Sequence, residues 1–220
     1  MQTLKNVSKG IGLLGGTFDP IHLGHVEIAK ATRDKYDLSI VVIIPAFQNP
    51  LRIHEQVIAG TRDRLVMCYL ATQDEDWLYA DSIEIERGRH QPGPSYTIDT
   101  LQGYHMRYPD VPLTMILGAD NVALHKWKDV DQFPQYLKRI AAVARPDYED
   151  QFRKDLLESR KVHPEVADLV EFIPSVNSPF SSTAVRESLR SGKVPTENLH
   201  PHVVQFITKY GLYGCKDICG

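Results

Sequence analysis

Residues 11–25 read IGLLGGTFDPIHLGH, and this stretch decides the fold. Its first part, Ile11 to Gly15, has the length and apolar character of a buried strand. A second glycine and a turn at Asp19-Pro20 follow, and a segment with helical character begins near His22. A strand, a tight turn and a helix in this order open an α/β sheet, where ligands lie beyond the carboxyl ends of the strands. We therefore expect a ligand site around this turn.

Two histidines stand at the start of the predicted helix. His22 and His25 are three residues apart, which puts both imidazoles on one side of the first turn, and Gly24 between them leaves room for a ligand. A helix N-terminus offers amide N–H groups and partial positive charge to phosphate oxygens. Imidazoles can add hydrogen bonds to charge that develops in a transition state. A zinc site would need three or four ligands in another spacing, so we expect no protein-held metal.

The same region contains a misleading motif. Residues 10–15, GIGLLG, match the G-x-G-x-x-G pattern of dinucleotide-binding proteins. That pattern requires a strand before the first glycine and a helix at the last. Here polar residues precede Gly10 and the glycines fall inside the predicted strand, so the match does not indicate a dinucleotide site.

The rest of the chain continues the alternation of strand and helix. It predicts an α/β fold, a Rossmann-like doubly wound, mostly parallel sheet with helices on both faces. With no linker, repeat or low-complexity tract, residues 1–220 are expected to form one domain. The expected strands are Ile11–Gly15, Ser39–Pro45, Leu113–Gly118, Arg139–Ala144 and Leu169–Pro174. The expected helices are His22–Tyr36, Thr61–Gln73, Tyr96–Arg107, Tyr148–Arg160, Ser182–Ser191 and His202–Tyr210.

The amino-acid composition limits the kinds of partner and the cellular setting that we expect. Among 220 residues, 25 Lys and Arg stand against 28 Asp and Glu, giving a net charge of −3, which argues against a nucleic-acid partner. No apolar run approaches the roughly 20 residues of a membrane-spanning helix, and no secretory signal is visible. Three cysteines do not make a disulfide framework, which favours a reduced, cytoplasmic setting. The sequence leaves open whether the chain is a monomer or a homo-oligomer.

A second candidate phosphate site follows the last predicted strand. Ser181-Ser182-Thr183-Ala184-Val185-Arg186 opens a helix, and serine or threonine there could serve only as the N-cap. Arg186 is unusual, because a cation in the first turn opposes the helix dipole. An anion between the helix start and the guanidinium would remove that penalty. Both interpretations stay open on spacing alone.

These two motifs resemble the signature of the nucleotidylyltransferases of the H-x-G-H superfamily. The resemblance implies a Rossmann-like fold and attack of a phosphate on the α-phosphorus of a nucleoside triphosphate, with release of pyrophosphate. It implies that His22, His25 and Arg186 are catalytic, and that Ser182, Thr183 and Arg186 hold the triphosphate. It also implies Mg²⁺ carried with ATP.

Three further segments are Pro94-Ser95-Tyr96-Thr97, Gly118-Ala119-Asp120 and Lys126-Trp127-Lys128. On their own, Ser95 could be an ordinary N-cap and Trp127 a partly buried packing residue. In this order they resemble the nicotinate mononucleotide adenylyltransferase family. The resemblance implies mononucleotide contacts at Thr17, His22, Arg52, Thr97, Ile98 and Trp127. It implies ATP contacts at Gly15, Gly16, Thr17, Phe18, His25, Gly118, Asp120, Arg145, Ser182, Thr183 and Arg186.

The expected activity is adenylyl transfer from ATP to nicotinate mononucleotide, giving deamido-NAD and pyrophosphate in NAD biosynthesis. The alternatives are the same chemistry on nicotinamide mononucleotide, and a non-catalytic nucleotide-binding protein of the same fold. Two other features are interpreted as structural. Arg87-Gly88-Arg89-His90 is expected to be a solvated turn, and Cys215 and Cys219 are expected to lie in a frayed end.

Overall fold

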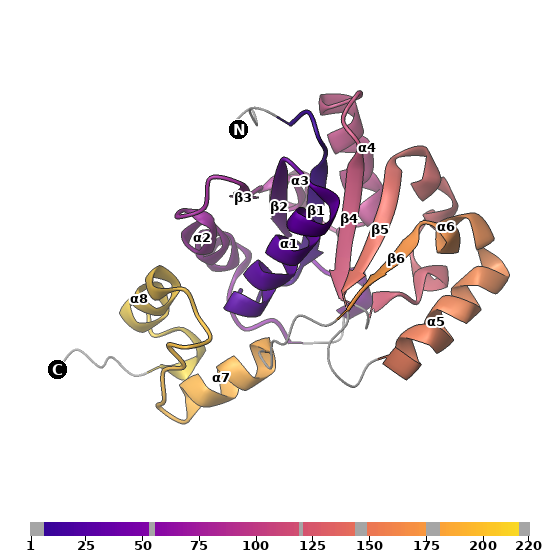
Figure 1. The fold of residues 1–220 in the computed structure, drawn as a ribbon. Coiled ribbons are helices and arrows are strands. Elements are labelled where there is room, and N and C mark those ends of the chain that lie inside the picture. The colour runs from indigo at the N-terminus through magenta and orange to yellow at the C-terminus, as the bar shows by residue number, and fades with distance from the viewer. Residues whose placement is uncertain (1–6, 53–55, 119–120, 144–148, 175–180, 216–220) are drawn as a thin grey trace.

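The computed structural model describes residues 7–52, 56–118, 121–143, 149–174 and 181–215. Its centre is a six-stranded sheet in which every neighbouring pair of described strands is parallel. The strand order is β3-β2-β1-β4-β5-β6, so the order reverses between β1 and β4 (Figure 1). The strands are β1 (Ile11–Gly16), β2 (Ile40–Pro45), β3 (Leu78–Ala80), β4 (Leu113–Gly118), β5 (Leu137–Val143) and β6 (Val170–Ile173).

Both faces of the sheet are covered by helices, as the sequence predicts. The helices are α1 (Leu23–Tyr36), α2 (Thr61–Thr72), α3 (Ile83–His90), α4 (Thr97–Arg107), α5 (Glu149–Val162), α6 (Pro164–Asp168), α7 (Ser182–Arg190) and α8 (Pro201–Lys209). One core cluster joins the sheet to α1, α2, α7 and α8, and the other joins it to α4, α5 and α6. Alternate residues of β2 belong to different clusters: Val41 and Ile43 to the first, Ile40 and Val42 to the second. This alternation explains why the central strands are apolar at nearly every position.

The predicted elements agree with the structure, with ends that differ by at most two residues among the described positions. Three elements were not predicted, β3, α3 and α6, because they are short and lack a clear apolar period. The prediction of a solvated turn at Arg87–His90 is wrong, since these residues form the last turn of α3. Position 88 of this helix needs a glycine, because the Phe47 ring packs where the Cβ of any other residue would lie.

The glycines of the G-x-G-x-x-G match lie in or beside β1, where no helix opens at the last of them. Gly12 is buried between neighbouring strands, and a Cβ there would lie 2.9 Å from Cδ1 of Ile116. A contact that short requires a neighbour to move, so this glycine is needed for packing. The prediction that these glycines fall inside a strand, with no helix at the last of them, is confirmed.

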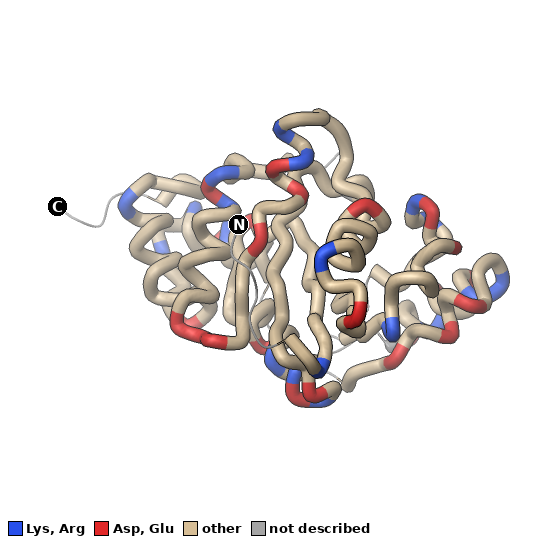
Figure 2. The backbone as a smooth tube through the Cα atoms, turned by 90° about the horizontal axis from the view of Figure 1, so that it is seen from above, with Lys and Arg blue, Asp and Glu red and all other residues tan. Residues whose placement is uncertain are grey.

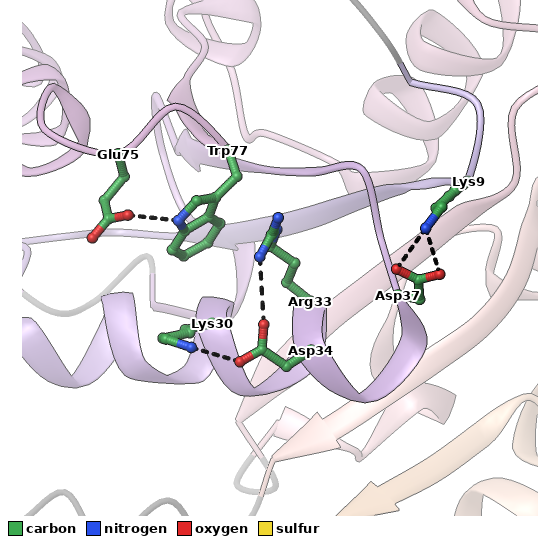
Figure 3. Close-up of polar contacts among 7 residues, drawn as sticks. All are labelled: Lys9, Lys30, Arg33, Asp34, Asp37, Glu75 and Trp77. Carbon is green, nitrogen blue, oxygen red and sulfur yellow. Dashed lines mark hydrogen bonds and ion pairs between the residues drawn. The ribbon is translucent and has the colours of Figure 1, made fainter.

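Charged residues of both signs lie side by side along the exposed helices and loops (Figure 2). Around the C-terminal half of α1, Lys9 pairs with Asp37 at 2.8 Å, and Lys30 pairs with Asp34 at 2.6 Å (Figure 3). These exposed pairs are worth little individually. Within the described part of the chain, no helix combines the length and the apolar surface required to cross a bilayer.

Candidate active site

A cleft of about 830 Å³ lies at the carboxyl ends of β1 and β4, where the strand order reverses. This is the place where open α/β sheets bind ligands. Gly16 ends β1 and Gly118 ends β4, and both line the cleft. The cleft reaches from the starts of α1 and α7 to the start of α4 and Trp127. We call these the phosphate end and the pyridine end, after the groups that the sequence resemblance leads us to expect there.

The loop between β1 and α1 is held by a buried arginine. Arg64 of α2 is 1% exposed and donates hydrogen bonds to the backbone carbonyls of Thr17 and Ala46, the second at 2.7 Å. Burial lowers the pKa of the Arg64 guanidinium, and the carboxylate of Asp19 opposes that shift. Phe18 adopts a positive φ of 51°, which a bulky residue rarely does without support. Arg64 therefore fixes the shape of the loop from behind.

The two histidines of α1 lie against each other. His22 is the N-cap residue, 3% exposed, and its ring stacks on that of His25 at a centroid distance of 3.7 Å. The backbone N–H of His22 donates to Nδ1 of His25 at 3.2 Å, so Nε2 carries the proton of a neutral His25. The rings of Phe18 and His25 pack in a T-shaped arrangement with a centroid distance of 4.9 Å. His25 lines the cleft, whereas His22 lies behind it.

Asp19 joins four segments of the chain. Its carboxylate accepts hydrogen bonds from the amides of Ile58 (2.8 Å) and Ala59 (3.0 Å) and from the hydroxyl of Tyr213 (2.8 Å). Its backbone carbonyl accepts a hydrogen bond from Arg186 at 2.7 Å. Tyr213 has a φ of 61°, and its pKa is raised by burial and by the neighbouring carboxylate. The C-terminal segment thus contacts the loop between β1 and α1 directly.

The start of α7 packs on the same loop. Ser181 is the N-cap and accepts a hydrogen bond from the amide three residues further on, at 3.1 Å. Ser182 donates to the carbonyl of Pro20 at 2.9 Å, and Arg186 donates to the Thr183 hydroxyl at 3.2 Å. The cap role expected of this motif therefore falls to Ser181. Ser182, Thr183 and Arg186 line the same cleft as His25.

At the pyridine end, Thr97 opens α4 and Trp127 follows a short 3-10 turn. The half-buried indole packs against Phe133 in a T-shaped arrangement, with ring centroids 6.1 Å apart, and it also lines the cleft. Trp127 therefore both packs in the protein and is available to a ligand. Lys128 lies over the Tyr96 ring at 4.3 Å. Ser95 is not the N-cap of α4; that position belongs to Tyr96, and the Ser95 hydroxyl accepts from the Phe47 amide at 2.9 Å.

The cleft brings together most of the residues singled out in the sequence. Those that line it are Gly15, Gly16, Thr17, Phe18, His25, Thr97, Gly118, Trp127, Ser182, Thr183 and Arg186. Ile98 is 3% exposed and packs in the core beneath α4. Arg52 ends a 3-10 turn beside Leu51, which lines the cleft. Asp120 and Arg145 lie outside the described residues, as does Cys219, whereas Cys215 is buried rather than frayed.

Sequence reasoning missed several residues that shape the cleft, namely Asn49, Arg64, Glu84, His125 and Tyr213. Arg64 could have been found as a cation on the buried face of a predicted helix, where an unpaired charge is rarely tolerated. The others carry no local signal. Over the described ranges, no three His, Cys, Asp or Glu side chains are grouped closely enough to hold a metal ion.

The fold and the cleft define a nucleotidyltransferase, and the chain belongs to the cytidylyltransferase-like family, whose model matches residues 13–188. Within that family, two bacterial relatives are named probable nicotinate-nucleotide adenylyltransferase. The relative from Corynebacterium kroppenstedtii is 35% identical over 97% of this chain and 94% of its own. The relative from Roseiflexus sp. is 38% identical over 94% of this chain and 98% of its own.

Solved structures support the fold. Nicotinic acid mononucleotide adenylyltransferase from Plasmodium falciparum, in complex with NaAD, has a TM-score of 0.72 and 16% identity, covering 94% of this chain and 98% of its own. A putative nicotinate-nucleotide adenylyltransferase from Vibrio parahaemolyticus has a TM-score of 0.58 and 17% identity, covering 93% and 95%. The Rossmann-like prediction is confirmed.

Proposed function

We propose that this protein transfers the adenylyl group of ATP to nicotinate mononucleotide, giving deamido-NAD and pyrophosphate, as a cytoplasmic step of NAD biosynthesis. The observation that carries the proposal is that one cleft joins the phosphate end to the pyridine end. The names of the bacterial relatives and the NaAD complex of the Plasmodium enzyme support the same substrates. The whole chain acts as one domain, and its oligomeric state is a separate question.

At the phosphate end, His25 donates a hydrogen bond to an oxygen of the reacting α-phosphate, while His22 orients His25 and its neighbouring amides. Arg186 holds the leaving pyrophosphate, with Ser182 and Thr183 beside it. This division follows from the structure, since His25 and Arg186 both line the cleft, whereas the buried His22 ring stacks on His25 and does not line it. Positioned cations and N–H donors stabilise the charge that grows on phosphate oxygens.

The chemistry is an in-line displacement. A phosphate oxygen of the mononucleotide forms a bond to the α-phosphorus of ATP, and the bond from that phosphorus to the oxygen bridging to the β-phosphate breaks. Pyrophosphate leaves with the electron pair. The nucleophile is already an anion, so alignment and charge stabilisation suffice without a general base. ATP enters as its Mg²⁺ complex, in which phosphates and water hold the ion.

At the pyridine end, the backbone amides of Thr97 and Ile98 receive the ring carboxylate, and Trp127 stacks on the ring. The first amides of a helix suit an anion because they have no partner within the helix. Thr17 and Arg52 bind the phosphate of the mononucleotide. Gly15, Gly16, Phe18, Gly118, Asp120 and Arg145 contact the ATP.

The test compares two substrates in one assay. The protein is incubated with MgATP and either nicotinate or nicotinamide mononucleotide, and pyrophosphate and the dinucleotide are both measured. We expect the acid to be the better substrate by kcat/KM. A preference for the amide would contradict the proposed substrate, and no pyrophosphate with either would indicate a non-catalytic nucleotide-binding protein.

A further inference from the structure

A buried carboxyl group lies beneath the start of α4 and has no part in the proposed chemistry. Glu84 of α3 is 7% exposed and lines the cleft at the pyridine end. Burying a carboxyl group without partners is energetically costly. Glu84 also lines the same end of the cleft as Thr97, where we place the anionic carboxylate of the pyridine ring. Its presence there calls for a physical reason.

The partners of Glu84 flank the turn that opens α4. The Thr100 hydroxyl donates to Oε1 of Glu84 at 2.7 Å, and the Ser95 hydroxyl lies close enough to the carboxyl group to help lower its pKa. These two hydroxyls come from either side of Tyr96 and Thr97. A carboxylate can accept at either of its two oxygens, whereas the neutral amide of the same shape has only one acceptor oxygen. Glu84 therefore ties the two sides of the turn together.

Arg87 supplies a second contact from the same helix. It lies one turn after Glu84 and donates to the Thr100 hydroxyl at 3.2 Å and to the Tyr96 carbonyl at 3.5 Å. Its guanidinium is also 4.0 Å from the carboxylate of Asp99. The positive charge of Arg87 balances Glu84, so the pair can lie under the cleft without repelling an anion strongly.

We infer that Glu84 is a positioning residue for substrate selection, which holds the first turn of α4 so that its amides fit the planar carboxylate of the pyridine ring. This inference rests on the proposed function. Two N–H donors discriminate a carboxylate from a carboxamide only when their spacing is fixed, because a loosened turn accepts either group equally. Glu84 would then affect the choice between acid and amide without touching either.

The test is Glu84→Gln, with Glu86→Gln as the matched control. Gln keeps the size and one acceptor but places an NH2 group where a hydroxyl donates. Glu86 lies two residues further on the same helix, is exposed and accepts a hydrogen bond from the Ser82 hydroxyl. In Glu84→Gln we expect KM for nicotinate mononucleotide to rise about tenfold, KM for ATP to stay unchanged, and the preference for acid over amide to fall. Glu86→Gln should match the wild type.

A second variant and a second measurement distinguish a loss of positioning from a general loss of folding. Thr100→Val removes one donor to Glu84 while keeping the shape, and it should shift the acid-to-amide ratio in the same direction. Amide hydrogen exchange over residues 96–100 should be faster in Glu84→Gln than in Glu86→Gln, whatever the substrate. The ratio of the two kcat/KM values does not depend on the folded fraction, so a merely structural role would leave it unchanged.

The outcomes separate this inference from the proposed function. Suppose that the wild type turns over nicotinate mononucleotide, and that Glu84→Gln has the same acid-to-amide ratio of kcat/KM and the same amide hydrogen exchange as the wild type. That result would overturn the inference about Glu84 and leave the proposed function standing. An equal rise in KM for ATP and mononucleotide would also overturn it. A wild-type protein that uses neither mononucleotide would contradict the proposed function, and unchanged exchange in the variant would then remove the positioning role as well.

Discussion

The two ends of the cleft are built in different ways. At the phosphate end, contacts join segments that are far apart in sequence, such as Ser182 with Pro20 and Tyr213 with Asp19, separated by 162 and 194 residues. At the pyridine end, Glu84 and Arg87 reach Thr100 across only 16 and 13 residues. The phosphate end therefore depends on the whole fold, whereas the pyridine end can be altered locally. We expect changes at the first to affect turnover and changes at the second to affect substrate binding and choice.

The largest effect is expected for His25→Ala, which removes the proposed donor to the reacting phosphate. A donor that acts in the transition state contributes about 10²- to 10³-fold to kcat. We expect a loss of that size in kcat with little change in KM for ATP, measured by pyrophosphate release. An equal loss in turnover and ATP affinity would show that His25 only binds substrate.

The chain offers a matched control for this variant. His202 lies in the first turn of α8, and its ring is 5.4 Å from that of His200, much as His25 lies near His22 in α1. His202 does not line the cleft. His202→Ala should therefore leave kcat unchanged, and a comparable loss there would indicate a general effect of removing a helix-start histidine.

The next largest effect is expected at the pyridine end, for Trp127→Ala. Stacking of an aromatic ring on a base is worth about 1–3 kcal/mol, so KM for the mononucleotide should rise by at least about fivefold. KM for ATP should stay unchanged, as judged by initial rates with each substrate varied in turn. Trp77→Phe is the control, because Trp77 lies near Arg33 and Glu75, beside α1 (Figure 3). A rise in both KM values would mean that Trp127 supports the whole cleft.

A smaller effect is expected for Tyr213→Phe, which deletes one hydroxyl and leaves Asp19 with its two backbone donors. A hydrogen bond to a buried carboxylate contributes about 1.5–3 kcal/mol, so the melting temperature should fall and kcat should decrease severalfold. The preference for acid over amide should not change. Tyr210→Phe, which alters an exposed tyrosine of the same segment, should have no effect. A changed preference would show that the two ends are not independent.

The same contrast explains which features the sequence predicts. The phosphate end is encoded in two short motifs, residues 15–25 and 181–186, and their meeting follows from the rule that strand ends share one edge of a parallel sheet. Tyr213 was missed because its partner lies 194 residues away, and a separation of that size leaves no local pattern. Glu84 was missed because α3 itself was not predicted. The charged residues and Gly88 of this segment are typical of a turn, and the contact of Phe47 with the glycine cannot be read from the local sequence.

The smallest predicted effect concerns pH and the stability of the pyridine end. Burial raises the pKa of Glu84 above the usual 4.5, although the hydroxyls of Thr100 and Ser95 and the charge of Arg87 oppose the shift, while Asp99 adds to it. Between the unfolded and folded pKa values the unfolded chain binds fewer protons, so this group destabilises the protein as pH rises through that interval. One proton limits the slope to about 1.4 kcal/mol per pH unit. In urea unfolding above pH 4.5, Glu84→Gln should therefore lose less stability with rising pH than the wild type, whereas Glu86→Gln should follow the wild type. Parallel curves for all three proteins would mean that Glu84 titrates normally and that its partners fully compensate for its burial.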